Sequence, residues 1–270
     1  MPNRDQEFTR LVAAEGRKLL AFTRRSCGDG TDAEDVVQEA FALAFGSWHQ
    51  LAQAESARAW LYTIARRVCQ RLHRKRSDEP AFLESFEALL PGETPTIPDL
   101  GAFTGGPHAD RVRSEAREIV ERAMAELPEA YRRPLVLAEI AELTASEIAL
   151  VLGLKEASVK TRLHRGRLKL RAVLAPRLPQ RRTPPEEHAR KVCLDLVQAK
   201  LDAMARQAPF PYSNEALCER CRTVIGTLDL ASKSCAALEA EQFPDRLRIA
   251  ILAAGRQPSA ALPRHGPRPR

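Results

Sequence analysis

The sequence is poor in the residues that build β-sandwiches and β-barrels. Aromatic residues make up 5% of the 270 positions, and there are 13 glycines. No stretch shows the alternation of apolar and polar residues that is typical of strands. Ala, Leu, Glu and Arg are plentiful instead, and these residues favour helices. We therefore expect an all-α fold made of small helical domains.

A long apolar run is also missing. A membrane-spanning helix needs roughly 18 to 20 consecutive apolar residues, and no stretch approaches that length. The first residues, MPNRDQEFTRL, lack the apolar segment of a signal peptide. We expect a cytoplasmic protein with no membrane partner.

Patterns typical of enzymes are absent as well. The sequence holds no paired carboxylates in a basic setting, no phosphate-binding glycine loop and no Ser/His or Cys/His constellation. These absences argue against a metal-dependent nuclease or another nucleic-acid enzyme. We expect no enzymatic activity, no catalytic residues and no organic cofactor.

Positive charge, by contrast, is concentrated in two stretches. The net charge is +7; residues 61–76 hold six Lys or Arg and no acid, and residues 155–182 hold ten against a single Glu. Two concentrated basic surfaces indicate a polyanionic partner. The wide apolar and aromatic face of a lipid-binding helix is missing from both, so nucleic acid is the favoured partner.

The second basic stretch lies in a pattern of two helices joined by a tight turn. Thr144 and Glu147 fit a capping box at the start of the first helix, and Gly153 lies where that helix should end. The second helix has a narrow arc of inward positions: Val159, Leu163, Gly166 and Leu170. Its opposite arc and flanks are polar and basic: Ala157, Ser158, Thr161, His164 and Arg165, with Lys160, Arg162, Arg167 and Lys169 beside them. This layout predicts a helix-turn-helix that reads the major groove.

Clusters of proline and glycine divide the chain into three parts. The predicted domains are residues 1–76, 111–174 and 188–256, with linkers at 77–110 and 175–187 and a disordered tail at 257–270. In the first domain, TDAEDVVQEAFALAF predicts a helix with an acidic outer face, and ARAWLYTIARRVCQRLHRKR predicts an aromatic and basic helix. Aromatic side chains beside cations can stack on unpaired bases as well as fill a core.

These segments, taken in order, resemble the bacterial RNA polymerase sigma factors of the sigma-70 superfamily, and in particular the extracytoplasmic function (ECF) group. DAEDVVQEAF is similar to the segment that docks on core polymerase, and ARAWLYTIARRVCQRLHRKR is similar to the helix that opens and reads the −10 element. The helix-turn-helix, from ELPEAYRRPL onward, is similar to the part that reads the −35 element. The resemblance covers residues 1–175 and implies two partners, core RNA polymerase and promoter DNA.

The resemblance also implies roles for individual residues. Contacts with core polymerase fall to Asp35, Gln38 and Glu39. Contacts with the melted −10 strand or nearby phosphates fall to Trp60, Arg66, Arg67, Arg71 and Arg74. Contacts with −35 base edges fall to Ser158, Thr161 and Arg165, and contacts with phosphates to Lys160 and Arg162. The basic helix carries Arg67 and Gln70 where the family commonly has Asn and Asp.

Four cysteines fall within the third domain. Asn214 is a candidate helix cap that would place Cys218 and Cys221 one turn apart on one face. Two such thiolates can share a soft metal ion, and the remaining two cysteines, Cys193 and Cys235, would complete a tetrahedral site. The domain resembles the cysteine-rich C-terminal domain of metal-responsive ECF sigma factors, which implies a switch operated by Zn, Cu or Cd that makes a separate anti-sigma factor unnecessary.

Other interpretations of the sequence remain open. The cysteines could be buried structural residues, could hold a purely structural Zn, or could form a redox-sensing CxxC pair. The helix-turn-helix could belong to a transcriptional regulator that binds duplex DNA without polymerase. A cytosolic metal-binding protein with incidental basic domains would explain the third domain but not the two sigma-like segments.

Overall fold

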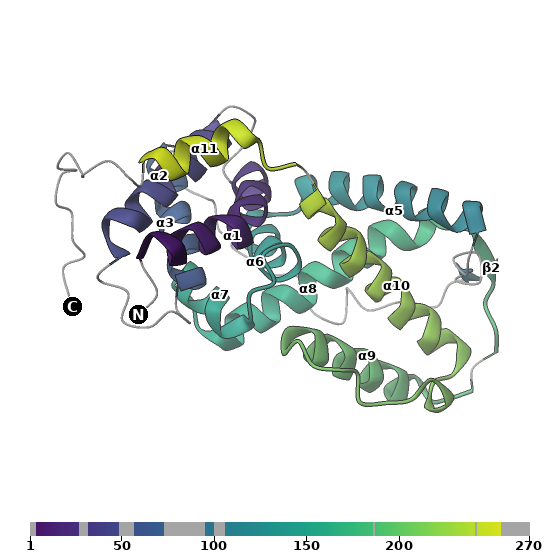
Figure 1. Cartoon of the computed structure of the whole chain (residues 1–270). Helices are drawn as coiled ribbons and strands as arrows, with labels where there is room; N and C mark the ends of the chain where they lie inside the picture. The colour runs from purple at the N-terminus through teal and green to yellow at the C-terminus, as the bar shows by residue number, and fades with distance from the viewer. Residues whose placement is uncertain are drawn as a thin grey trace.

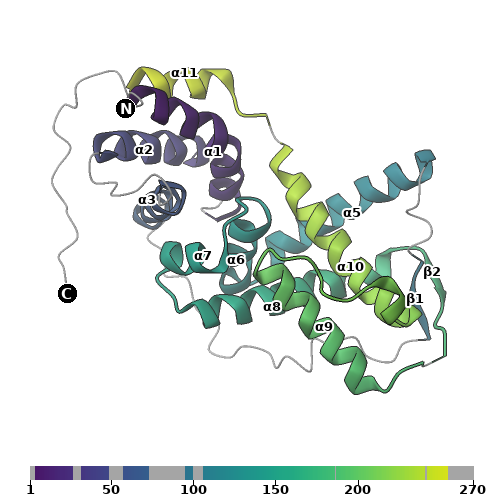
Figure 2. The same ribbon diagram turned by 60° about the horizontal axis from the view of Figure 1, so that its bottom comes forward.

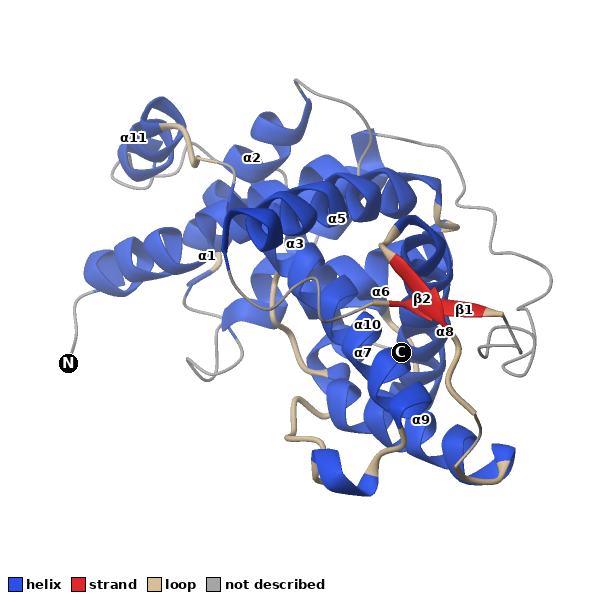
Figure 3. Cartoon of the chain, turned by 90° about the vertical axis from the view of Figure 1, so that its right-hand side faces the viewer, coloured by secondary structure: helices blue, strands red, loops and turns tan. Residues whose placement is uncertain are grey.

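The computed structural model describes residues 4–26, 32–48, 57–72, 95–99, 106–185, 187–240 and 242–254. Within these ranges the chain is predominantly helical, which confirms the predicted all-α fold (Figure 3). The described helices are α1 (Arg4–Ser26), α2 (Asp32–Gly46), α3 (Ala57–Leu72), α5 (Gly106–Glu126), α6 (Glu129–Glu139), α7 (Ala145–Leu152), α8 (Glu156–Leu174), α9 (Arg190–Ala205), α10 (Glu219–Ala236) and α11 (Asp245–Ala254). None of them is long and apolar enough to cross a membrane. The tail predicted at 257–270 lies outside the described residues.

The segments predicted as linkers contain a small antiparallel sheet. Strand β1 (Thr96–Pro98) pairs with β2 (Gln180–Arg182), with Ile97 opposite Arg181. The side chain of Ile97 is buried. Helix α5 begins at Gly106, inside the stretch that the sequence predicted as linker. Ordered structure therefore extends into both predicted linkers.

Helices α1, α2 and α3 pack around a shared apolar centre. Phe22 of α1 meets Tyr62 of α3 edge-on, with ring centroids 5.5 Å apart, and both side chains are fully buried. On α2 the apolar side chains repeat at helical spacing, so that Val37 and Phe41 lie in the core while Asp35 stays exposed. The acidic outer face predicted for this helix is present.

Helices α5 to α8 contain the predicted helix-turn-helix. Thr144 accepts a hydrogen bond from the backbone N–H of Glu147, whose carboxylate accepts one from the backbone N–H of Thr144, so the capping box is confirmed. Gly153 ends α7 with a φ of 69°. Gly166 of α8 lies so close to α6 that an added Cβ would meet Leu135 Cδ1 at 2.6 Å. The capping box fixes the start of α7, Gly153 permits the tight turn into α8, and Gly166 permits the close contact of α8 with α6.

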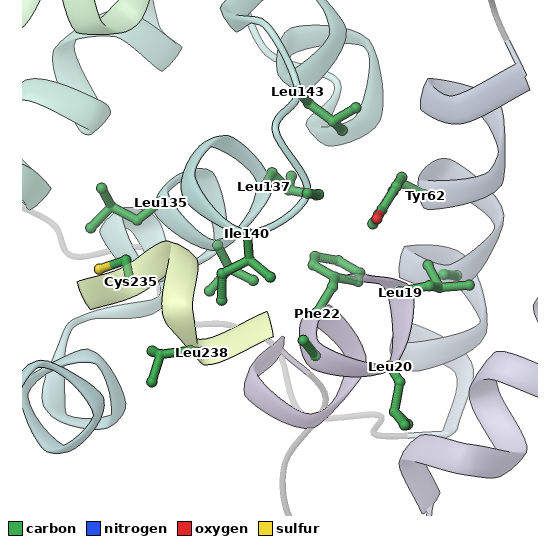
Figure 4. Packing of buried hydrophobic residues seen from close by; sticks show 14 of the residues in the cluster. Leu19, Leu20, Phe22, Tyr62, Leu135, Leu137, Ile140, Leu143, Cys235 and Leu238 are labelled. Atoms are coloured by element: carbon green, nitrogen blue, oxygen red, sulfur yellow. The ribbon is translucent and has the colours of Figure 1, made fainter. Parts of the chain in front are cut away.

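The two helical groups share one hydrophobic core. Figure 4 shows Phe22 and Tyr62 of the first group facing Leu137 and Ile140 of α6. Helix α7 packs against α3. At the edge of this contact Arg58 pairs with the buried carboxylate of Glu15 at 2.8 Å and donates a hydrogen bond to the backbone of the second group. The predicted −10 helix, α3, is therefore packed against α7, the first helix of the helix-turn-helix.

The residues after α8 are divided between two places (Figures 1 and 2). Helix α10 lies along α5 and α8, and α9 lies across α8 beside α10. Helix α11 lies apart from them, against α1 and α2, with Leu247 and Ile251 buried. Arg246 of α11 forms an ion pair with Glu34 of α2 at 3.2 Å. The stretch predicted as one C-terminal domain thus contacts both preceding groups.

Candidate nucleic-acid interface and metal centre

The first half of α8 presents a polar surface. All four residues of the predicted inward arc are buried, whereas Thr161 is exposed and Ser158 and Arg165 are half-buried. Thr161 donates its hydroxyl hydrogen to the backbone carbonyl of Ala157 at 3.0 Å. Lys160 pairs with Glu156 at 2.7 Å, an ion pair that a phosphate could replace. This half of the helix has the residue types and the exposure that base-edge and phosphate contacts require.

Two polar residues predicted on the outside of α8 are buried, and here the sequence-based interpretation was wrong. His164 is 7% exposed because α9 covers it. Arg167 is 5% exposed and pairs with the buried Glu139 of α6 at 2.7 Å. Ser232 of α10 donates a second hydrogen bond to the same carboxylate. A clue in the sequence was Glu139 itself, an acid within the apolar run PLVLAEIA, since buried carboxylates need partners.

The basic residues of α3 lie in three different surroundings. Arg67 is exposed. Arg66 is half-buried, and burial, with the neighbouring charge of Arg133 of α6, lowers the pKa of its guanidinium. Arg71 forms an ion pair with Glu39 of α2. Trp60 packs against the main core with part of its surface exposed, and Arg74 lies outside the described residues.

The predicted polymerase-docking face of α2 is only partly open. Asp35 and Gln38 are exposed, but Glu39 is engaged by Arg71. Glu34, one turn from Gln38, is paired with Arg246 of α11. Helix α11 therefore borders the acidic face, and a partner that docks on α2 has to lie beside it.

Three of the four predicted thiol ligands meet at one site. The Sγ atoms of Cys193, Cys218 and Cys221 all lie within 4.8 Å of one another. Cys193 comes from the first turn of α9, and the other two from the start of α10. Cys218 is the N-cap of α10, and its sulfur accepts a hydrogen bond from the backbone N–H of Cys221 at 3.4 Å; Asn214, the predicted cap, begins a short 3-10 turn instead.

The surroundings of this cluster are apolar. Leu196, Leu217 and Ile225 pack around the sulfurs. Burial, with hydrogen bonds from the other two thiols, raises the pKa of Cys221 far above its usual range. A metal ion would have to displace these protons, as is general for thiolate sites.

The donor set fits a soft metal ion. Metal–sulfur bonds of about 2.3 Å place sulfurs that share one ion roughly 4 Å apart, which is compatible with three sulfurs that all lie within 4.8 Å of one another. Thiolates select Zn and Cu(I) over hard cations. His188, five residues before Cys193, is exposed, and its Nδ1 lies 2.9 Å from the backbone carbonyl of Glu187.

Cys235 is not part of this site, which corrects the four-cysteine prediction. It lies in the same helix as Cys221 but fourteen residues later, a distance of roughly 21 Å at 1.5 Å per residue. Figure 4 shows Cys235 beside Leu135 in the main core, where it is fully buried. Burial and the nearby carboxylate of Glu139 raise the pKa of its thiol. Its position favours a structural role.

Comparison with known proteins gives a consistent family. The chain matches the Sigma-70 region 2 family over residues 11–79 and the Sigma-70, region 4 family over residues 117–170. The ECF RNA polymerase sigma factor SigW of Bacillus subtilis is 31% identical over 172 residues, which cover 63% of this chain and 90% of SigW. The RNA polymerase sigma factor CnrH of Cupriavidus metallidurans is 31% identical over 170 residues, covering 62% of this chain and 86% of CnrH. The ferric citrate uptake sigma factor FecI of Escherichia coli is 28% identical over 153 residues, covering 57% and 82%.

The matched families coincide with the two helical groups described above. The first spans most of α1 and all of α2 and α3, and the second spans much of α5 and α8 with α6 and α7 between them. Helices α9 to α11, with the thiol cluster, follow the second match. The chain belongs to the sigma-70 superfamily, as an ECF RNA polymerase sigma factor.

Proposed function

We propose that this sigma factor reads the −10 element with α3 and the −35 element with α8, and that a soft metal ion at the thiol cluster controls its activity. An RNA polymerase sigma factor is a transcription initiation factor and not an enzyme. The task of the chain is therefore to position core polymerase and DNA. Capture of unstacked bases drives strand separation, at a cost of only a few kcal/mol per base.

The residue roles are those that the resemblance to the family implies. Ser158, Thr161 and Arg165 supply base-edge contacts from α8, with Lys160 and Arg162 on phosphates. Trp60, Arg66, Arg67 and Arg71, together with Arg74, supply the −10 contacts. Asp35, Gln38 and Glu39 dock on core polymerase. The exposed state of Asp35, Gln38, Arg67 and Thr161 supports these roles.

The metal proposal is carried by a single observation, the convergence of three thiols from two helices within 4.8 Å. Cys193, Cys218 and Cys221 would hold Zn, Cu or Cd, and the bound ion would join α9 to α10. Control from within the chain would make a separate anti-sigma factor unnecessary. Redox sensing is the weaker alternative, because a reactive cysteine needs a lowered pKa and the pKa of Cys221 is raised.

Run-off transcription tests both parts of the proposal. The template is the DNA upstream of the coding sequence, and core polymerase is supplied with metal-stripped chain alone or with Zn, Cd or Cu. We expect transcripts whose yield depends on metal. The double variant Cys218→Ala with Cys221→Ala should transcribe independently of metal, and Cys235→Ala, the same change at a cysteine outside the cluster, should keep the dependence.

The other outcomes separate the alternatives. Transcripts that ignore metal in the unmodified chain would reject control by metal and leave the sigma function. No transcript under any condition, with duplex DNA bound in the absence of core polymerase, would favour a regulator that acts without polymerase.

A further inference from the structure

Helix α9 covers the same face of α8 that carries the proposed base contacts. Leu168 follows Thr161 by seven residues, which brings it to within about 20° of Thr161 around the helix. His164 lies about 60° from Thr161. Thr161 is exposed, but His164 is 7% exposed and Leu168 is fully buried. The DNA-facing side of α8 is therefore open in its first half and closed in its second.

Helix α9 covers most of this second half of the DNA-facing side of α8. Asp202 Oδ1 lies 3.4 Å from His164 Nε2, and the side chain of Gln198 lies 3.4 Å from His164 Nδ1. Val197 and Leu201 pack on Leu168, together with Leu228 of α10. Figure 2 shows α9 beside α8 and α10. Packed helices keep their axes roughly 8 to 10 Å apart, so α9 stands directly outside the face in question.

A DNA duplex needs the space that α9 fills. The major groove is about 12 Å wide and 8.5 Å deep, so a helix seated in it has sugar-phosphate backbone rising along its flanks. His164 and Leu168 are only about 4.5 and 10.5 Å along the axis from Thr161. A groove that receives Thr161 at its floor would bring its wall against α9. The covered arrangement and a seated duplex exclude each other.

The contact between α9 and α8 has a solvent-open hollow at one edge. A cavity of about 220 Å³ lies where the end of α9 approaches α6 and α8. Leu163 and Arg167 line it from α8, and Met204 and Ala205 line it from α9. Polar side chains, among them Glu139, Asp229 and Ser232, also line this hollow, so the interface is open to water at one edge.

We propose that α9 is an autoinhibitory cover on the recognition helix, and that the sigma factor engages the −35 duplex only after α9 leaves α8. The inference rests on the proposed function in taking α8 as the −35 reader. It also connects the thiol cluster to the cover, because Cys193 lies on α9 one turn from Val197, which packs against α8. A metal bound there acts on the helix that covers the DNA-binding face.

The test uses two variants of the full chain with the same chemical change. Val197→Asp places a carboxylate in the buried contact with α8, and Val192→Asp places one at an exposed position of α9. Affinity for a fluorescent duplex from the upstream region is measured by anisotropy. Because apparent affinity scales with the fraction of open molecules, we expect Val197→Asp to bind at least tenfold more tightly than the unmodified chain. Val192→Asp should bind within twofold of it.

A second measurement needs no substitution. Hydrogen exchange over residues 190–205 is followed in the unmodified chain with and without saturating duplex. Release of the cover predicts faster exchange of α9 when DNA is bound. If Val197→Asp does not fold, as shown by loss of its cooperative unfolding transition, hydrogen exchange in the unmodified chain tests whether α9 leaves α8.

The outcomes distinguish this inference from the function on which it rests. The proposal that α9 is a cover would be wrong if the unmodified chain and folded Val197→Asp bound DNA with equal affinity. It would also be wrong if α9 kept its protection from exchange in the DNA complex. Either result would leave α8 as the −35 reader. Failure of every form of the chain to bind duplex, with or without core polymerase, would overturn the assignment of α8 itself.

Discussion

Acidification should weaken the packing of α9 against α8, because the imidazole of His164 is buried between these helices in its neutral form. Burial, together with the nearby charges of Arg167 and Lys160, lowers the pKa of His164 from 6.5 to about 4, although Asp202 offsets part of the shift. When α9 is released or the chain unfolds, the imidazole meets water and its pKa returns to about 6.5. A proton therefore binds the released state more tightly than the covered state.

The sign and size of the effect follow from these two values. The stabilisation is fully present above pH 6.5 and is lost as the pH falls from 6.5 toward 4. At pH 5 the linkage relation gives a loss of about 2 kcal/mol in the free energy of unfolding, and below pH 4 about 3 kcal/mol. This is a large share of the stability of a typical domain.

Two measurements check this reasoning. An NMR titration of the imidazole Cε1–H resonances, with His164→Gln to assign the signal, should give a pKa of about 4 for His164. Urea unfolding of the two proteins at pH 7.5 and pH 5 should show their stability difference shifting by about 2 kcal/mol in favour of His164→Gln at the lower pH. A titration midpoint near 6.5, or a difference that does not change with pH, would refute the argument.

Three further predictions concern other parts of the molecule. Cys193→Ala should lower the amount of Zn or Cd bound per chain, measured by equilibrium dialysis, whereas Cys235→Ala should not, since only the first lies in the thiol cluster. Gly166→Ala should cost about 1 to 3 kcal/mol in urea unfolding because its Cβ would collide with α6, whereas Gly46→Ala, with open space around it, should change little. Arg58→Ala should cost about 1.5 to 3 kcal/mol because it removes the cation from the buried carboxylate of Glu15, which keeps a hydrogen bond from Tyr62; a thermal unfolding midpoint equal to that of the unmodified chain would contradict this.

Local sequence determined the elements that depend on near neighbours. The capping box of Thr144 and Glu147 joins residues three apart, and the left-handed end at Gly153 needs only a residue without a Cβ. The apolar arc of α8 follows from its spacing of three and four residues. Such features are formed within one or two turns of helix, so the helix-turn-helix could be predicted without knowledge of the fold.

The thiol cluster could be predicted only in part. Cys218 and Cys221 are joined by one turn of chain, and their proximity follows from spacing alone. Cys193 lies in the cluster because α9 packs against the start of α10. Cys235 lies outside it because the far end of α10 packs in the main core. A count of cysteines carries no information on either.

Tertiary structure alone decided which polar surfaces are covered. His164 meets Asp202, 38 residues later, Arg167 meets Glu139, 28 residues earlier, and Arg246 meets Glu34, 212 residues earlier. The sequence predicted the two helices that we propose read DNA, and it determined the family to which the chain belongs. Long-range packing decided that α3 lies against α7 and that α9 lies on α8, because burial depends on which elements meet in space. Residue periodicity specifies only one face of one helix at a time.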